Sequence, residues 1–275
     1  MSRDRILSIN LATLRGAGGF AEAVEACLRH DVTAIAPWRD QVEAIGLREA
    51  ARIVKANGLR VTGLCRGGMF PGADAEARNK AHEDNLRAID EATVLGADCL
   101  VLVCGGLPTG SRHLGDARKQ VAEGIAAILP RARAAKMPLA IEPLHPMYAA
   151  DRNCISTLDQ ALDLCAALGE GTGVAIDAYH VWWDPKLAEA VARAGRMKAI
   201  LAHHICDWLV PTRDLLNDRG MMGDGVIDLK AIRAEIEKAG YHGPQEVEIF
   251  STENWWKRPG DEVVATCLER FRTVC

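Results

Sequence analysis

The segment VAIDAYHVWWDPKLAEAVARAGRMKAILAHHI, residues 174–205, decides the fold class of this 275-residue chain. It opens with an apolar run typical of a buried strand, 174–179, and closes with another, 199–205. Between them, residues 186–195 have the periodicity of an amphipathic helix. A strand, a helix and a strand in this order form a unit whose two strands run parallel and are covered by helices.

The same alternation runs along the whole sequence. Strands are expected at 6–10, 33–38, 60–65, 99–104, 138–143, 174–179, 199–205 and 245–250. Helices are expected at 19–30, 41–57, 74–96, 112–135, 156–168, 186–195, 228–239 and 260–272. Eight such units predict an α/β fold, a closed (β/α)8 TIM barrel that residues 1–275 form as a single domain. The alternative is an open doubly wound sheet, but the first strand lacks the GxGxxG turn typical of that fold.

Composition and charge exclude several classes of protein. The chain has 33 basic and 37 acidic residues without a long run of either sign, so we expect neither nucleic acid nor a membrane surface as a partner. No apolar stretch is long enough to span a membrane, and the opening MSRDRILSIN carries charges where a signal peptide is apolar. Nine cysteines without a CxxC motif favour a reducing compartment. We therefore expect a cytoplasmic protein.

Polar residues stand at the ends of four consecutive strands, the fifth to the eighth. Catalytic groups of a TIM barrel come from these carboxyl ends. The residues are Glu142, Asp177 with His180, the pair His203 and His204, and Glu246 with Glu248. Each by itself is more often a solvated loop residue, a helix cap or a packed histidine. Their recurrence on neighbouring strands favours a shared divalent cation, because burying such groups unpaired is costly.

Strand parity limits which of these residues can share a site. Neighbouring residues of a strand point to opposite faces, so only one of His203 and His204 faces the barrel mouth. Glu246 and Glu248 share a face, so parity does not choose between them.

Five motifs carry a resemblance to a known family. EPLHP (142–146), DAYH (177–180), HHICD (203–207), RGMMGDG (219–225) and EVEIFS (246–251) resemble the spaced motifs of the xylose isomerase-like barrel superfamily. Within it, the pattern is most similar to the sugar-phosphate isomerase/epimerase group, which includes keto-sugar 3-epimerases and inosose isomerases and dehydratases. The motif similarity covers residues 138–251, and the first 130 residues match only in the β/α rhythm.

The resemblance implies one divalent metal ion, held by Glu142, Asp177, His204 and Glu248. His204 is chosen over His203 because the family's ligand histidine has an acidic residue three positions later. Glu248 is chosen because the last ligand lies in a VEIF-like motif. This oxygen-rich set suits Mn²⁺, with Mg²⁺, Co²⁺ or Zn²⁺ as alternatives. The implied reaction is isomerisation or epimerisation of a keto-sugar or polyol-derived ketone through an enediolate, with Glu142 and Glu248 as the acid–base pair.

Other residues are expected around the substrate or behind the ligands. The resemblance places His180 and Arg219 on the substrate, and Arg213 competes with Arg219 because the span from His204 is longer than in the epimerases. Position at the barrel mouth adds His145, which stands where the epimerases often have Asn, and also Trp38 and Arg66. Asp207 and Asp184 are expected to orient an imidazole, with plain surface acids as the alternative. The pairs Trp182–Trp183 and Trp255–Trp256 either line the pocket or pack between loops and helices.

Three other functions compete with the isomerase. A lyase or dehydratase would use the same enediolate chemistry. A phosphodiesterase resembling endonuclease IV needs three zinc ions and an Asp-x-His pair late in the chain, where this sequence has GDGVID. The third is a barrel without catalysis. The expected partner is a small carbohydrate, and homo-oligomerisation to a dimer or tetramer stays open.

Overall fold

The structure, a computed structural model, describes residues 5–275. Within them, nine strands form one parallel sheet in the order β3-β2-β1-β11-β8-β7-β6-β5-β4. A bridge between Trp38 and Cys65 joins the chain after β2 to β4 and brings the sheet near closure. The predicted (β/α)8 barrel is therefore confirmed. Its strands are β1 Leu7–Asn10, β2 Ala34–Ala36, β3 Arg60–Val61, β4 Leu64–Gly68, β5 Leu100–Val103, β6 Leu139–Ile141, β7 Thr172–Asp177, β8 Ile200–Ile205 and β11 Gln245–Val247.

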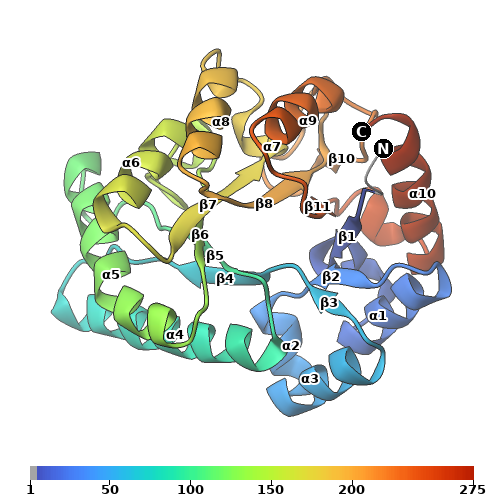
Figure 1. The fold of residues 1–275 in the computed structure, drawn as a ribbon, viewed down its shortest axis with the longest axis horizontal. Helices are drawn as coiled ribbons and strands as arrows, with labels where there is room; N and C mark the ends of the chain where they lie inside the picture. The colour runs from blue at the N-terminus through green and yellow to red at the C-terminus, as the bar shows by residue number, and fades with distance from the viewer. Residues whose placement is uncertain (1–4) are drawn as a thin grey trace.

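Helices surround this barrel (Figure 1). Helix α4 shows how the sequence sets their ends: the Asp74 side chain accepts a hydrogen bond from the Ala77 N–H at the start, and Gly96 adopts a left-handed conformation at the end. The helices are α1 Phe20–Arg29, α2 Arg39–Ile45, α3 Leu47–Ala56, α4 Ala75–Leu95, α5 Leu114–Ala134, α6 Leu158–Leu168, α7 Ala178–Val181, α8 Leu187–Arg196, α9 Leu229–Lys238 and α10 Gly260–Thr273, with short 3₁₀ helices η1 Leu11–Ala17, η2 Pro146–Tyr148 and η3 Trp255–Lys257.

Several expected elements differ in detail. The helix expected over 41–57 is divided at Gly46, whose φ of 89° interrupts the helical backbone. The strand expected over 60–65 consists of β3 and β4. The strand expected over 174–179 ends at Asp177, because its side chain caps α7 by accepting from the Tyr179 N–H. The segment after β8 also contains an antiparallel pair, β9 Asp207–Trp208 with β10 Arg219–Gly220.

The barrel interior changes from apolar to polar along its strands. Small apolar side chains that alternate along the strands form an inner cluster, which consists of Cys65, Cys99, Val101, Ala140, Ala175 and Ala202. A second, larger cluster fills the space between the sheet and the helices. The small inner side chains leave room at the carboxyl ends of the strands, where the polar residues of the sequence motifs lie.

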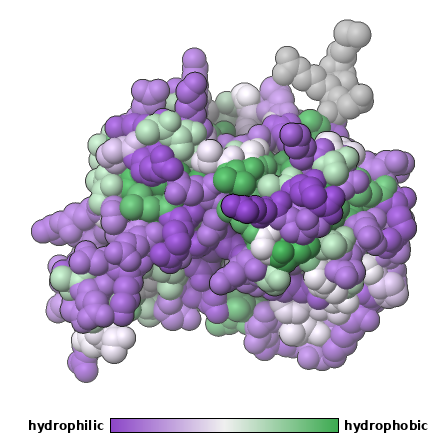
Figure 2. All heavy atoms as spheres, turned by 90° about the horizontal axis from the view of Figure 1, so that it is seen from below, coloured by the Kyte–Doolittle hydropathy of each residue, from purple (hydrophilic) through white to green (hydrophobic). Residues whose placement is uncertain are grey.

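The outer surface is mostly hydrophilic on the face seen from below Figure 1, with smaller hydrophobic areas between the charged side chains (Figure 2). Among residues 5–275, no helix combines the length and apolar character that crossing a membrane requires. The nine cysteines are all buried and form no disulfide.

Candidate metal centre

Four residues from four neighbouring strands meet at the carboxyl end of the barrel. Glu142 follows β6, Asp177 ends β7, His204 lies in β8, and Glu248 follows β11. One ligand atom of each lies within 4.8 Å of those of the other three, and all four residues are buried. Parallel pairing aligns them, because Asp177 and Glu246 both stand opposite His204 in the register. The structure thus brings together the four residues that the motifs single out.

The His204 ring lies between two carboxylates. Its Nδ1 is 3.0 Å from Glu142 Oε1, and its Nε2 is 3.5 Å from Glu246 Oε1. Burial opposes protonation of the ring, but Glu246, Glu142 and Glu248 outweigh it and raise the pKa of His204 well above its ordinary value. A carboxylate behind an imidazole is typical of metal-binding histidines, whose orientation it fixes. Glu246 therefore supports His204, a role that its shared face with Glu248 could have indicated.

Asn10, at the end of β1, connects the centre to the opposite side of the barrel. Its Nδ2 donates to Glu246 Oε1 at 2.8 Å and to Glu248 Oε1 at 3.0 Å. Its Oδ1 accepts from Trp38 Nε1 at 2.7 Å and from the Ala12 N–H at 3.0 Å. Asn10 is not among the residues predicted from the sequence, although its position as a polar residue at the end of an apolar strand could have indicated a place in the site. Asn10 fixes the direction in which the Glu248 carboxylate points.

Arg219 is the buried cation of the site. Its Nη1 donates to Asp177 Oδ2 at 3.1 Å and to Glu248 Oε2 at 3.0 Å. Its Nη2 lies 3.1 Å from His180 Nε2, and its guanidinium stacks on the Tyr179 ring at 4.5 Å. Burial lowers the pKa of His180 to about 3, so this ring is neutral. Arg219 and His180 are thus held beside Asp177 and Glu248, and their contact with substrate stays a prediction.

The electrostatics of the four residues fit a divalent cation. Burial raises the pKa of Glu142, and it raises that of Glu248 to about 8 with a contribution from the neighbouring Glu142. Arg219 and His204 oppose these rises, and for Asp177, where burial also opposes ionisation, the charge of Arg219 prevails and lowers the pKa. A divalent cation would favour the charged forms of Glu142 and Glu248 in the same way. Three carboxylates and one imidazole form a hard, oxygen-rich donor set. We conclude that Glu142, Asp177, His204 and Glu248 fit a metal ion.

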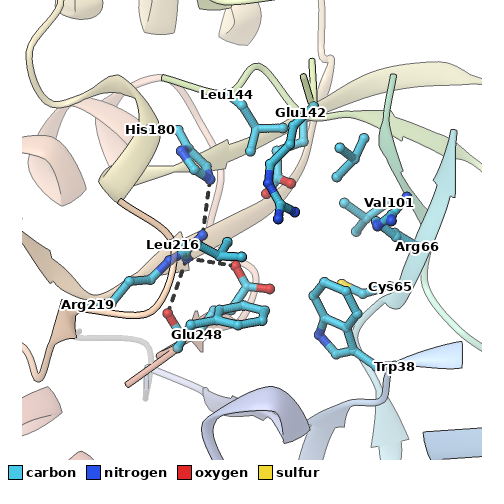
Figure 3. A pocket seen from close by; sticks show the side chains of 13 residues that line it. Trp38, Cys65, Arg66, Val101, Glu142, Leu144, His180, Leu216, Arg219 and Glu248 are labelled. Carbon is cyan, nitrogen blue, oxygen red and sulfur yellow. Dashed lines mark hydrogen bonds and ion pairs between the residues drawn. The ribbon is translucent and has the colours of Figure 1, made fainter. Parts of the chain in front are cut away.

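Two of these residues, Glu142 and Glu248, line a cavity of about 120 Å³, and Asp177 and His204 lie behind its lining. That volume is roughly ten times the 10–15 Å³ that one water molecule needs, so it suits a small ligand. In Figure 3, His180, Arg219 and Glu248 lie on the left, and Trp38, Cys65 and Arg66 lie on the right. The expected positions of Trp38 and Arg66 at the mouth therefore agree with the structure.

Two residues of the surroundings have contacts other than those expected. His145 is outside the set of residues that line the cavity, because its ring packs against Trp208 at 5.0 Å and against Trp183 at 5.6 Å. Its backbone N–H instead donates to His180 Nδ1 at 3.3 Å. Asp184 orients no imidazole, since its carboxylate accepts from the Lys186 N–H in the turn before α8.

Asp207 also has a different role from the expected one. Its carboxylate accepts hydrogen bonds from the backbone N–H groups of Trp208, Gly223 and Ile227 at 2.8–3.0 Å. It therefore organises the loop after β10 instead of an imidazole. Arg213 is no longer a competitor for Arg219, because it pairs with Asp218 at 2.6 Å and lies largely exposed.

His203 and the two tryptophan pairs pack outside the lining of the cavity. His203 is buried outside the group of four, and neither ring nitrogen has a hydrogen-bond partner among the described residues. Burial lowers the pKa of His203 to about 3, which keeps it neutral. The two tryptophan pairs lie outside the cavity lining; Trp182, for example, packs on Trp208 at 5.7 Å.

Fold and site define a TIM barrel with a candidate metal centre at the carboxyl ends of its strands. The family model for the xylose isomerase-like TIM barrel matches residues 13–273, and the chain belongs to this family. The crystal structure of protein SMc04130 from Sinorhizobium meliloti 1021 is 73% identical in sequence, covers 98% of each chain and has a TM-score of 0.97.

More distant relatives share the fold. The IOLI protein, whose structure holds a zinc atom, is 19% identical over 98% of this chain and 97% of its own, with a TM-score of 0.84. A D-allulose 3-epimerase from Methylomonas sp., in complex with D-allulose, is 19% identical over the same shares, with a TM-score of 0.78. The inosose isomerase of Bacillus velezensis is 28% identical over 127 residues, which are 44% of this chain and 43% of that protein. The match to this curated relative therefore spans less than half of its length.

Proposed function

We propose that this chain is a divalent-metal-dependent sugar isomerase or epimerase that acts on a keto-sugar or a polyol-derived ketone. The observation that carries the proposal is the buried group of Glu142, Asp177, His204 and Glu248, of which Glu142 and Glu248 line a small cavity. The names of two relatives, an inosose isomerase and a D-allulose 3-epimerase, support this class of reaction. Mn²⁺ is the proposed ion, and Mg²⁺, Co²⁺ and Zn²⁺ also suit the donor set.

A divalent ion at this centre would act as a Lewis acid toward the carbonyl and hydroxyl oxygens of the substrate. Glu142 and Glu248 both line the cavity and lie close to each other, so we assign them the acid and base roles. Asn10 and Arg219 fix the two oxygens of Glu248, which keeps this carboxylate aimed at the reacting carbon. Neutral His180 and charged Arg219 orient the substrate oxygens from the same side.

Carbon-bound hydrogen exchange tests the proposal. Purified protein with Mn²⁺ is incubated in D₂O with a panel of keto-sugars and inososes, and deuterium on carbon is measured by NMR and mass spectrometry. We expect incorporation beside the carbonyl of at least one compound, and we expect Glu142→Gln to abolish it while His203→Leu does not. Absence of incorporation with every compound would overturn the proposal. Product analysis in the same samples distinguishes isomerisation from elimination of water.

Metal content separates this proposal from a nuclease of the endonuclease IV type. The described residues contain one group of His, Cys, Asp and Glu side chains with ligand atoms close enough for a metal, and it has four members. We therefore expect about one ion per chain by elemental analysis of metal-loaded protein. Three zinc ions per chain would instead support the phosphodiesterase.

A further inference from the structure

The cavity has a second charged feature besides the metal centre. Two arginines line it, Arg66 from β4 and Arg152 from the loop between η2 and α6. Among residues 5–275, neither guanidinium forms a hydrogen bond or an ion pair, and Arg152 only lies over the Tyr148 ring at 5.9 Å. By contrast, the half-buried Arg39 pairs with Asp84 at 2.8 Å and with Glu91 at 2.5 Å. Arg39 is thus held by carboxylates of the protein, whereas Arg66 and Arg152 leave their guanidinium groups available to a ligand in the cavity.

The backbone aims Arg66 at the cavity by a β-bulge. The register of β4 against β5 shifts between Cys65 and Gly67, so Arg66 is the extra residue of the bulge. Bulges next to active sites commonly redirect a side chain. Asn85 from α4 holds the bulged strand, since its side chain accepts from the Gly68 N–H at 2.6 Å and donates to the Gly68 carbonyl at 2.8 Å. The position of Arg66 is therefore built into the fold.

The segment that carries Arg152 is fastened as well. The Leu107 N–H donates to the Ala150 carbonyl at 2.7 Å, and the Cys154 N–H donates to the Gly105 carbonyl at 2.9 Å. These bonds tie the segment to the loop after β5, whose strand also pairs with β4. Arg66 and Arg152 thus come from neighbouring parts of the barrel rim.

We infer that Arg66 and Arg152 form an anion subsite, and that the substrate is a carbohydrate with a carboxylate or phosphate group at the end remote from its carbonyl. Guanidinium groups bind such oxyanions with paired, charge-assisted hydrogen bonds. Burial lowers the pKa of Arg66, and the charge of Arg152 lowers it further, so the two cations repel each other until an anion lies between them.

The two arginines and the metal centre would orient such a substrate. The guanidinium groups attract an anionic group, whereas a metal ion at the centre would bind carbonyl and hydroxyl oxygens. The anionic end then lies against Arg66 and Arg152, and the carbonyl end lies toward the metal centre. This orientation rests on the proposed isomerase or epimerase function, but the anion subsite itself is testable by binding alone.

The test compares three ketoses that differ only at carbon 6: D-fructose, D-fructuronate and D-fructose 6-phosphate. Their affinities for the Mn²⁺-loaded protein are measured by isothermal titration calorimetry. We expect at least one acidic probe to bind at least about ten-fold more tightly than D-fructose, as charge-assisted hydrogen bonds of this strength provide. The comparison of carboxylate and phosphate identifies which anion the subsite prefers.

Variants then connect the preference to the two arginines. Arg66→Met and Arg152→Met should each reduce the preference for the acidic probe over D-fructose to about three-fold or less, because one of the two cations is lost, while the Mn²⁺ affinity stays unchanged. Arg66→Lys and Arg152→Lys, which keep the charge, should retain part of it, and thermal unfolding checks that every variant folds. Arg112→Met is the matched control, since Arg112 is exposed on the loop after β5 and does not line the cavity.

The outcomes separate this inference from the proposed function. Equal affinity for the three probes, absence of binding by all of them, or an equal loss in Arg112→Met overturns the anion subsite. If D-fructose or another neutral ketose exchanges deuterium under those conditions, the isomerase proposal still stands. If an acidic probe binds through Arg66 and Arg152 but no compound exchanges deuterium, the subsite stands and the isomerase proposal fails.

Discussion

The two sides of the cavity are built from different halves of the barrel. Strands β6, β7, β8 and β11 position Glu142, Asp177, His204 and Glu248, of which Glu142 and Glu248 line the cavity, while β4, β5 and the end of β2 supply Arg66, Val101 and Trp38. The first side is acidic and its polar groups contact one another; the second is apolar apart from Arg66, which lacks a partner among the described residues (Figure 3). One half of the barrel therefore has the donors for a cation, and the other has the surface for a ligand.

Asn10 lies between these halves, since β1 pairs with β11 on one side and with β2 on the other. Its amide contacts Trp38 on the ligand side and Glu248 on the metal side. Asn10 thus directly connects the metal side of the cavity with the ligand side. Variants on each side test whether the metal side alone determines metal affinity.

The largest effect is expected for Asp177→Asn, which removes a charge from the metal side with little change of shape. Its Oδ2 is one of the buried oxygens next to Arg219, so we expect Mn²⁺ affinity to fall by at least about 100-fold. Titration calorimetry with Mn²⁺ measures this. Val103→Ala on the ligand side is the control and should leave the affinity unchanged; equal losses in both variants would contradict the division.

The second prediction concerns the pH dependence of metal binding, which only the acidic side should produce. Glu248, with a pKa near 8, and His204, with a raised pKa, hold protons in the metal-free protein, and the metal requires both to be deprotonated. Mn²⁺ affinity should therefore rise as pH rises from about 6 to 8, by about ten-fold or more. Calorimetry in buffers of different ionisation enthalpy should detect proton release. A constant affinity over this interval would show that neither group is protonated before the metal binds.

The third prediction uses the connection between the halves. Asn10→Ala removes the donor to Glu246 and Glu248 without removing a ligand, so Mn²⁺ affinity should fall by about ten-fold. Trp38→Phe removes only the bond that orients Asn10 and should have a smaller effect, measured in the same way. If Trp38→Phe equals Asn10→Ala, the ligand side contributes to metal binding more directly than the contacts indicate.

The smallest effect is expected for His203→Leu, beside the ligand. His203 is neutral and has no hydrogen-bond partner among the described residues, so Mn²⁺ affinity should stay within about two-fold, and the free energy of unfolding should change by less than about 1 kcal/mol. His204→Leu is the matched variant and should abolish binding. Calorimetry and urea unfolding measure the two quantities, and a loss of metal by His203→Leu would reverse the assignment.

The sequence alone was enough for the barrel, because that prediction depends on local periodicity and on strand ends. The choice of the four grouped residues also needed the motif resemblance, since strand parity does not choose between Glu246 and Glu248. Asp177 and His204 lie on strands with clear apolar patterns, and parallel register then aligns their ends. Strand parity also determined that His203 and His204 have different environments.

Tertiary structure alone decided the contacts around these residues. Asn10 donates a hydrogen bond to Glu248, which is 238 positions away in the sequence. Arg66 is the extra residue of a β-bulge, and the local sequence pattern does not predict that bulge. Asp207 and His145 were misplaced because their partners depend on how loops close over the barrel mouth. Periodicity fixes which face a side chain takes, whereas its partner is fixed only when distant segments pack together.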